Sequence, residues 1–178
     1  MGCESYNCSE LDDHLLNDCE VNEQGGSDSI IVLDCGHTVT DPSDATQINA
    51  NIASGKAKLI ENIKAGIPLA SPVEVDSPIG CRPATVVNYD RTMTLLDANV
   101  NANNVGFYDS INGGRAIGGV IVYACTANKV FFVDESIKST GSVTLPDTDN
   151  EFIRFESTFK WKSINNPVYA AAPAGIFS

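Results

Sequence analysis

The most constraining feature of the sequence is the segment EFIRFESTFKWKS at residues 151–163. Ile153, Phe155, Phe159 and Trp161 fall on one face of this segment, whereas charged and polar residues fall mostly on the other. An alternation with a period of two indicates a β-strand with one buried face, which is typical of antiparallel sheets. We therefore expect an antiparallel strand whose aromatic side chains belong to the core.

Further segments have the composition of strands and of two short helices. We expect strands at residues 29–33, 57–63, 85–97, 116–125, 129–134 and 141–145. One helix is expected between an N-cap at Ser43 and a stop at Gly55, and a second within 98–114, capped by Asp97, Asn99 or Asn101. This order predicts an α+β fold that is mainly antiparallel β: a sandwich or barrel-like sheet with one or two short flanking helices.

The chain of 178 residues has the length of about one domain with appended segments. Residues 1–55 contain eleven of the 23 acidic residues and no Lys or Arg, a composition typical of a solvated face or a disordered segment, and one that an interaction arm can also have. We expect an acidic, cysteine-containing arm at 1–27, a β-rich core at 28–164 with a long Pro-rich loop at 65–83, and an apolar tail at 165–178.

The arm, the Pro-rich loop and the tail each contain apolar residues that a compact monomer would leave exposed to water. Such segments gain stability by packing on a neighbouring surface. The expected interface residues are Leu11, Leu15, Leu16, Ile67, Pro68, Pro72, Val168, Tyr169, Ile176 and Phe177.

Four cysteines near the start of the chain raise the question of a metal site. Cys3, Cys8, Cys19 and Cys35 could supply four thiolates to zinc, but structural zinc sites favour two close pairs and only the first two residues are close. A zinc site, a disulfide and reduced thiols remain open, with reduced thiols favoured. Cys81 and Cys125 lie in apolar stretches and are expected to be buried.

Oxygen-bearing side chains alternate in the segment DANVNANN at residues 97–104, as at the start of a calcium loop. The segment lacks the glycine and the final acid of such a loop, so a helix cap is the better interpretation. We expect no bound cofactor.

Catalytic motifs are scarce. The sequence has two histidines, His14 and His37, and contains no GxSxG, P-loop or HExxH motif. Cys35-Gly36-His37 is better explained as a turn after a strand than as a nucleophile and its base. We therefore expect no enzymatic activity. A hydrolase that depends on His37 stays as a weaker alternative.

The overall charge and hydropathy exclude several partner classes. The formal net charge of −12 argues against specific binding of nucleic acid, whose phosphates would be repelled. No apolar run reaches the roughly 18 residues of a membrane span. The acidic start lacks the basic and apolar regions of a secretory signal, so we expect synthesis in the cytoplasm.

The order of these stretches resembles small structural proteins of tailed bacteriophages, especially those that infect Bacteroidetes. The shared features are a cysteine-rich start followed by GGSDSIIVLDC, TVTDPSDATQINANIASGK, NYDRTMTLLDANV, NVGFYDSI, AIGGVIVYAC and FESTFKWKSINNPV. The resemblance implies a non-enzymatic virion protein, a tail-tube subunit first and a collar or capsid-associated decoration protein second. It further implies that the chain binds copies of itself in a ring or helical oligomer, together with other virion proteins. Independently of the resemblance, an acidic surface that faced a channel would let DNA pass without sticking, because like charges repel.

A binding module is the alternative of a different class. A β-sandwich adhesin or carbohydrate-binding domain would present exposed aromatic side chains as a platform. The alternation around Phe155, Phe159 and Trp161 instead predicts that these three belong to the core.

Overall fold

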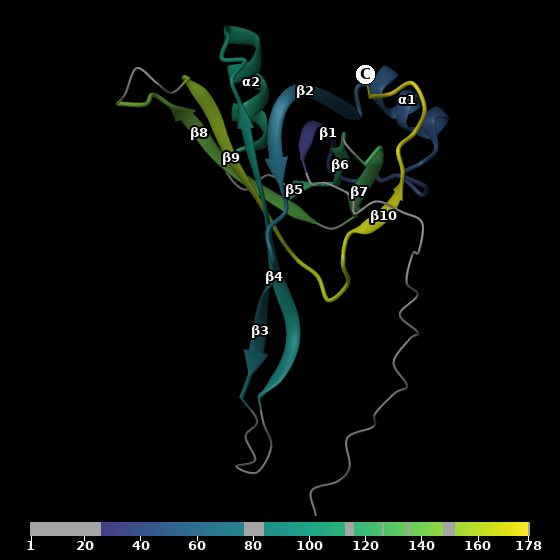
Figure 1. The fold of residues 1–178 in the computed structure, drawn as a ribbon, viewed down its shortest axis with the longest axis vertical. Helices are drawn as coiled ribbons and strands as arrows, with labels where there is room; N and C mark the ends of the chain where they lie inside the picture. The colour runs from purple at the N-terminus through teal and green to yellow at the C-terminus, as the bar shows by residue number, and fades with distance from the viewer. Residues whose placement is uncertain are drawn as a thin grey trace, which may run out of the picture.

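The computed structural model describes residues 26–76, 84–112, 116–125, 127–134, 136–147 and 152–177. The expected fold class is confirmed, because within these ranges ten antiparallel strands form one sheet with two helices against it (Figure 1). The strands are β1 (Ser27–Leu33), β2 (Ala57–Gly66), β3 (Ser71–Val75), β4 (Thr85–Asp97), β5 (Ala116–Ile117), β6 (Gly119–Ala124), β7 (Lys129–Val133), β8 (Ile137–Thr144), β9 (Arg154–Lys162) and β10 (Val168–Ala171). The helices are α1 (Ala45–Ala53) and α2 (Ala102–Ile111).

The main sheet closes on itself into a barrel. Its hydrogen-bonded order runs from β6 through β1, β2, β4, β9 and β8 to β5, and only Gly118 separates β5 from β6 in the chain. β5 and β6 are therefore two parts of one bent strand, of which β6 pairs with β1 and β5 pairs with β8. β7 and β10 extend the sheet beyond β6. Closure pairs strand edges that an open sheet would expose.

The barrel interior is filled by alternate side chains of its strands. On β9, Phe155, Phe159 and Trp161 are 2%, 0% and 5% exposed, as the alternation predicts, and Ser157 between them is also buried. They belong to one core cluster with residues of β1, β4 and β6, namely Ile30, Val32, Met93, Leu95, Val120 and Val122. The aromatic platform of a binding module therefore does not come from these three rings.

A second core lies on the outer face of β1, β6 and β7. Ile31 and Leu33 alternate with the interior residues of β1 and face this side, where they cluster with Ile48 of α1 and with Ile176 near the end of the chain. α1 and the last described residues thus form a layer over one side of the barrel.

The two ends of the barrel differ. α2 closes the end where β4 finishes, because Tyr108 and Ile111 enter the interior cluster. The β3–β4 hairpin extends from the opposite end (Figure 1). This end of the barrel has no helix over it among the described residues.

Two helix caps can be compared with the sequence. The expected cap Asn101 is confirmed for α2, since its side chain accepts the backbone N–H groups of Asn103 and Asn104. The expected cap Ser43 is wrong for α1, because the Asp44 side chain accepts the first free N–H groups of the helix. Both residue types are good caps, but the backbone N–H and the hydroxyl of Ser43 both donate to the Asp41 carboxylate, so this side chain is engaged before the helix begins.

Two other expectations need correction. The segment 65–83 is not one loop, since β2 continues to Gly66 and Ser71–Val75 forms β3, which pairs with β4. Pro72 is tolerated there because the described part of the sheet places β3 at an edge. Cys125 is exposed rather than buried, because it follows the last residue of β6 and lies in the turn to β7. Cys81 lies outside the described residues.

Candidate functional site

The sequence candidates for catalysis and metal binding do not form a site in the described part of the chain. Cys3, Cys8 and Cys19 lie outside the described residues, and Cys35 is exposed in the turn after β1. His37 belongs to the same turn, where its backbone N–H donates to the Asp34 carbonyl over 3.1 Å. Among the described residues, no group of three or more His, Cys, Asp or Glu side chains could hold a metal ion.

A buried carboxylate lies where β4 leads into α2. Asp97 is 1% exposed, and its Oδ1 accepts the backbone N–H of Asn99 over 2.7 Å, while its Oδ2 accepts the Tyr108 hydroxyl over 2.9 Å. The Tyr108 ring stacks on Phe155 with centroids 4.3 Å apart. Both carboxylate oxygens are thus engaged by protein donors, so the calcium-like segment serves to connect β4 to the helix.

Ionisation of the Tyr108 phenol should make the free energy of unfolding depend on pH. Burial raises the pKa of Tyr108 above its ordinary value of 10.0, and the hydrogen bond to Asp97 raises it further. Below pH 10 both the folded and unfolded phenol are neutral, so the full contribution to stability is present there. Above pH 10 only the unfolded phenol loses its proton readily, so we expect the free energy of unfolding to fall as pH rises.

Tyr108→Phe tests this prediction. At neutral pH the substitution should cost about 1–3 kcal/mol, because it leaves a buried Asp97 oxygen without its donor. Above pH 10 the variant should lose stability less steeply than the wild type. Urea unfolding from pH 7 to 11 measures both effects. Tyr123→Phe, which removes an exposed hydrogen bond to Asn128, is the matched control, and equal behaviour of the two variants would contradict the prediction.

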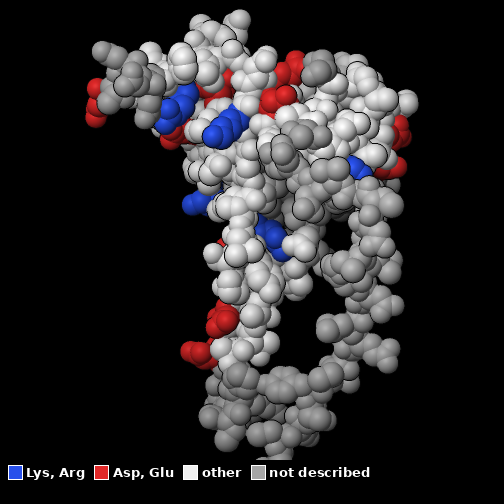
Figure 2. Space-filling model, viewed as in Figure 1, with Lys and Arg blue, Asp and Glu red and all other residues white. Residues whose placement is uncertain are grey.

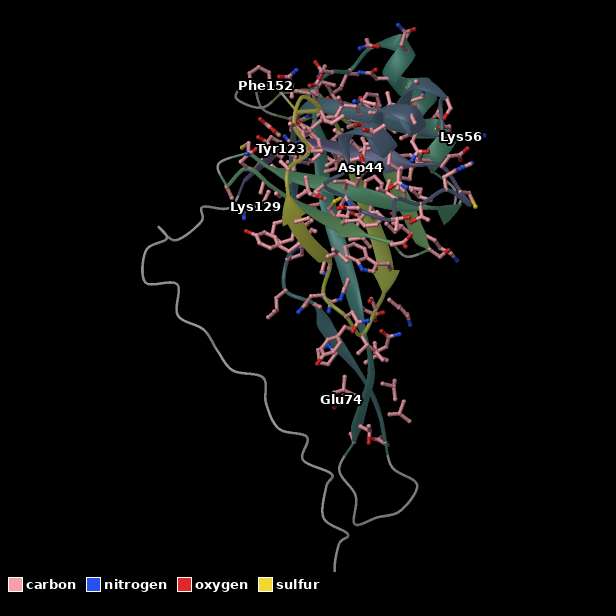
Figure 3. All side chains as sticks on the ribbon, turned by 90° about the vertical axis from the view of Figure 1, so that its right-hand side faces the viewer. Asp44, Lys56, Glu74, Tyr123, Lys129 and Phe152 are labelled. Carbon is pink, nitrogen blue, oxygen red and sulfur yellow. The ribbon has the colours of Figure 1, made fainter. Side chains whose placement is uncertain are left out.

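Among the described residues, the β3–β4 hairpin projects farthest from the barrel (Figures 1 and 3). Val75, Val86 and Val87 are 53%, 42% and 45% exposed on it. They are spread over both of its faces, since Val75 pairs with Thr85 and Val86 pairs with Glu74, and we call these three residues together the hairpin surface. Figure 2 shows acidic side chains toward the end of the hairpin and basic ones near its base. An isolated two-stranded hairpin is only marginally stable in water. This hairpin would therefore gain stability from a partner.

A second apolar surface lies at the opposite end of the barrel. Val143, Leu145, Phe152 and Ile153 are 47%, 73%, 80% and 46% exposed where β8 ends and β9 begins, and we call them the β8–β9 surface. The sequence pattern placed Ile153 on the buried face, which is wrong because β9 begins only at Arg154. The signal that could have revealed this surface is Phe152, which interrupts the polar face.

A large groove of about 1010 Å³ lies at the end of the barrel opposite α2. It contains three of the expected interface residues, Ile67, Pro68 and Tyr169. The groove is also lined by residues that the sequence did not single out. They come from β4, β7, the residue before β1, the segment between β2 and β3 and the segment after β9, and include Gly26, Leu69, Arg91, Phe131 and Ile164.

The other expected interface residues have different environments. Pro72 and Val168 are exposed on the edge strands β3 and β10. Ile176 is 8% exposed in the second core, and Phe177 stacks on Tyr123 with centroids 4.4 Å apart. The last part of the tail thus packs on its own domain, in contrast to the expected packing on a neighbour. Leu11, Leu15 and Leu16 lie outside the described residues.

In the described ranges, neither helix has the length and apolar character needed to cross a membrane.

Comparison of the chain with models of protein families, with curated proteins and with solved structures gave no match.

Proposed function

We propose that this protein is a non-enzymatic structural subunit of a phage virion that assembles with copies of itself, first of all as a tail-tube subunit. The observation that carries the proposal is the placement of two unlike apolar surfaces at opposite ends of one barrel. The hairpin surface extends from one end, and the β8–β9 surface lies at the other.

Unlike surfaces at opposite ends favour head-to-tail contacts. Such contacts form rings when the rotation closes and helical filaments when it does not. Full burial of one exposed large apolar side chain contributes about 1.5–3 kcal/mol. The seven side chains of the two surfaces are 42–80% exposed, so each would contribute a part of that value, and their sum is comparable in scale to an association cost of about 4–15 kcal/mol.

The virion assignment is supported by the resemblance of the sequence segments to tailed-phage structural proteins. The net charge of −12 suits a wall along which DNA passes, because like charges repel. A collar or decoration protein would use the same surfaces in a different geometry. A tail-tube subunit should form stacked rings or filaments, and a collar subunit should form single closed rings. A decoration protein should form small oligomers.

Light scattering and negative-stain microscopy of the full chain over a range of concentrations test this function. We expect rings, tubes or filaments, and we expect Leu145→Ser with Phe152→Ser to shift the assembly midpoint at least tenfold upward, since about 1.4 kcal/mol corresponds to tenfold. Val86→Thr with Val87→Thr should act in the same direction. Ala53→Ser, at the exposed end of α1, is the control. A monomer at every concentration would refute the proposed function.

A further inference from the structure

The groove at the open end of the barrel has an apolar lining that water contacts. Leu69 and Ile164 are 97% and 68% exposed on its margins. The Phe131 and Tyr169 rings lie 5.0 Å apart within it, and Ile67 packs against the barrel interior. Contiguous apolar surface of this kind is typical of a binding site for another segment or protein.

A buried cation lies in the same groove. Arg91 is 8% exposed, its Nε donates to the Ser163 carbonyl over 3.2 Å, and its guanidinium lies 5.6 Å from the centroid of the Tyr89 ring. No Asp or Glu among the described residues forms an ion pair with it. A guanidinium has five N–H donors, and a buried charge is costly unless it is paired. The groove therefore favours an occupant that has both apolar and acidic side chains.

The segment that precedes the groove in the sequence contains both apolar and acidic side chains. Gly26, the first described residue, lines the groove. The 25 residues before it contain seven Asp and Glu residues and no Lys or Arg, and Ser9 can cap a helical turn with Leu11, Leu15 and Leu16 on one side. The five residues 21–25 span about 17 Å when extended, which is enough to return a segment to the groove.

We propose that residues 9–20 of each subunit bind in the groove of the same subunit, with the leucines against its apolar lining and the acids near Arg91. A short tether gives its own groove an effective concentration in the millimolar range. The intramolecular site is therefore favoured over the groove of a neighbour. The arm would then pack on its own subunit and not on an adjacent one. Binding of the arm in the groove therefore does not require the subunits to assemble.

Disulfide trapping in the full chain tests the site. In a background where Cys3, Cys35, Cys81 and Cys125 are serine, Leu69→Cys places one thiol at the groove, and Cys8 and Cys19 provide the two thiols of the arm. Under mild oxidation we expect intramolecular disulfides from position 69 to Cys8 or Cys19, identified by peptide mass mapping of the monomer band.

Leu145→Cys in the same background is the matched control, because Leu145 is an exposed leucine at the opposite end of the barrel. We expect trapping at position 69 to be at least tenfold faster than at 145. A triple variant with Leu11→Ser, Leu15→Ser and Leu16→Ser should lower the rate at 69 to that of the control. Equal rates at 69 and 145, or no effect of the triple variant, would overturn the proposal.

The covalent product also separates this inference from the proposed function. Links at position 69 that join two chains, shown with isotopically labelled and unlabelled copies, would overturn the intramolecular site and leave assembly standing. Intramolecular links in a protein that stays monomeric would support the site and refute self-assembly.

Discussion

Gly118→Ala is expected to lower the free energy of unfolding by about 3 kcal/mol or more, the upper end of overpacking effects. A Cβ atom at this position would lie 2.3 Å from the carbonyl oxygen of Asp34 and 2.3 Å from that of His37. Both are backbone atoms of the turn after β1, so no side chain can move aside. The Gly118 N–H also donates to the Leu33 carbonyl over 3.0 Å, which holds the backbone in place.

The size of this effect matters because Gly118 is where the bent strand passes from one partner to another. β5 before it pairs with β8, and β6 after it pairs with β1. Displacement of the backbone here would oppose closure of the barrel. We expect Gly118→Ala to unfold at lower urea concentration and to lose amide protection first in β5 and β8.

Gly106→Ala is the matched control. Gly106 lies inside α2, and a Cβ atom there would have no neighbour within 4 Å. Alanine is the better helix residue by about 0.5–1 kcal/mol, so this variant should be slightly more stable than the wild type. If Gly118→Ala were no less stable than Gly106→Ala, the close approach that we assign to the strand junction would be wrong.

Phe159→Ala is expected to cost about 3–5 kcal/mol, the usual range for removing a buried phenylalanine. Phe159 is 0% exposed in the middle of β9 and packs in the interior cluster of the barrel. Its cross-strand neighbours are Met93 on β4 and Ser139 on β8, so the cavity would open between three strands. Chemical unfolding followed by circular dichroism measures the loss.

Phe152→Ala removes the same side chain two residues before β9, where it is 80% exposed. Its stability should change by no more than about 0.5 kcal/mol, as for other surface substitutions. Its assembly should weaken instead, because Phe152 belongs to the β8–β9 surface. Equal destabilisation by the two variants would contradict the assignment of Phe159 to the core and of Phe152 to the surface.

Local sequence pattern predicted much of the secondary structure. The strand expected at residues 85–97 has the same bounds as β4, and the alternation of Phe155, Phe159 and Trp161 correctly predicted which side chains fill the core. The cap at Asn101 was also among the expected ones. These features depend on residues close together in the chain, so periodicity and capping preferences are sufficient to find them.

The candidate surfaces were predicted only in part. Ile67, Pro68 and Tyr169 do line the groove, but Arg91 was not anticipated. The alternation of β4 does place Arg91 on the same face as Met93 and Leu95, but a charged side chain at such a position gives no sign of which groove it lies in. Likewise, the hydrogen bond between Tyr108 and Asp97 joins a helix to the end of a strand, and composition alone does not pair them.

The sequence by itself determined that this protein is a mainly antiparallel β-protein with an acidic start and apolar segments in excess of one core. Only the tertiary structure decided that the sheet closes through Gly118, that Ile176 and Phe177 pack on their own domain, and that Arg91 lies buried in a groove beside Gly26. The physical reason is that an alternating pattern sets which face of a strand is apolar, whereas the partner of that face is chosen by contacts between residues far apart in the chain.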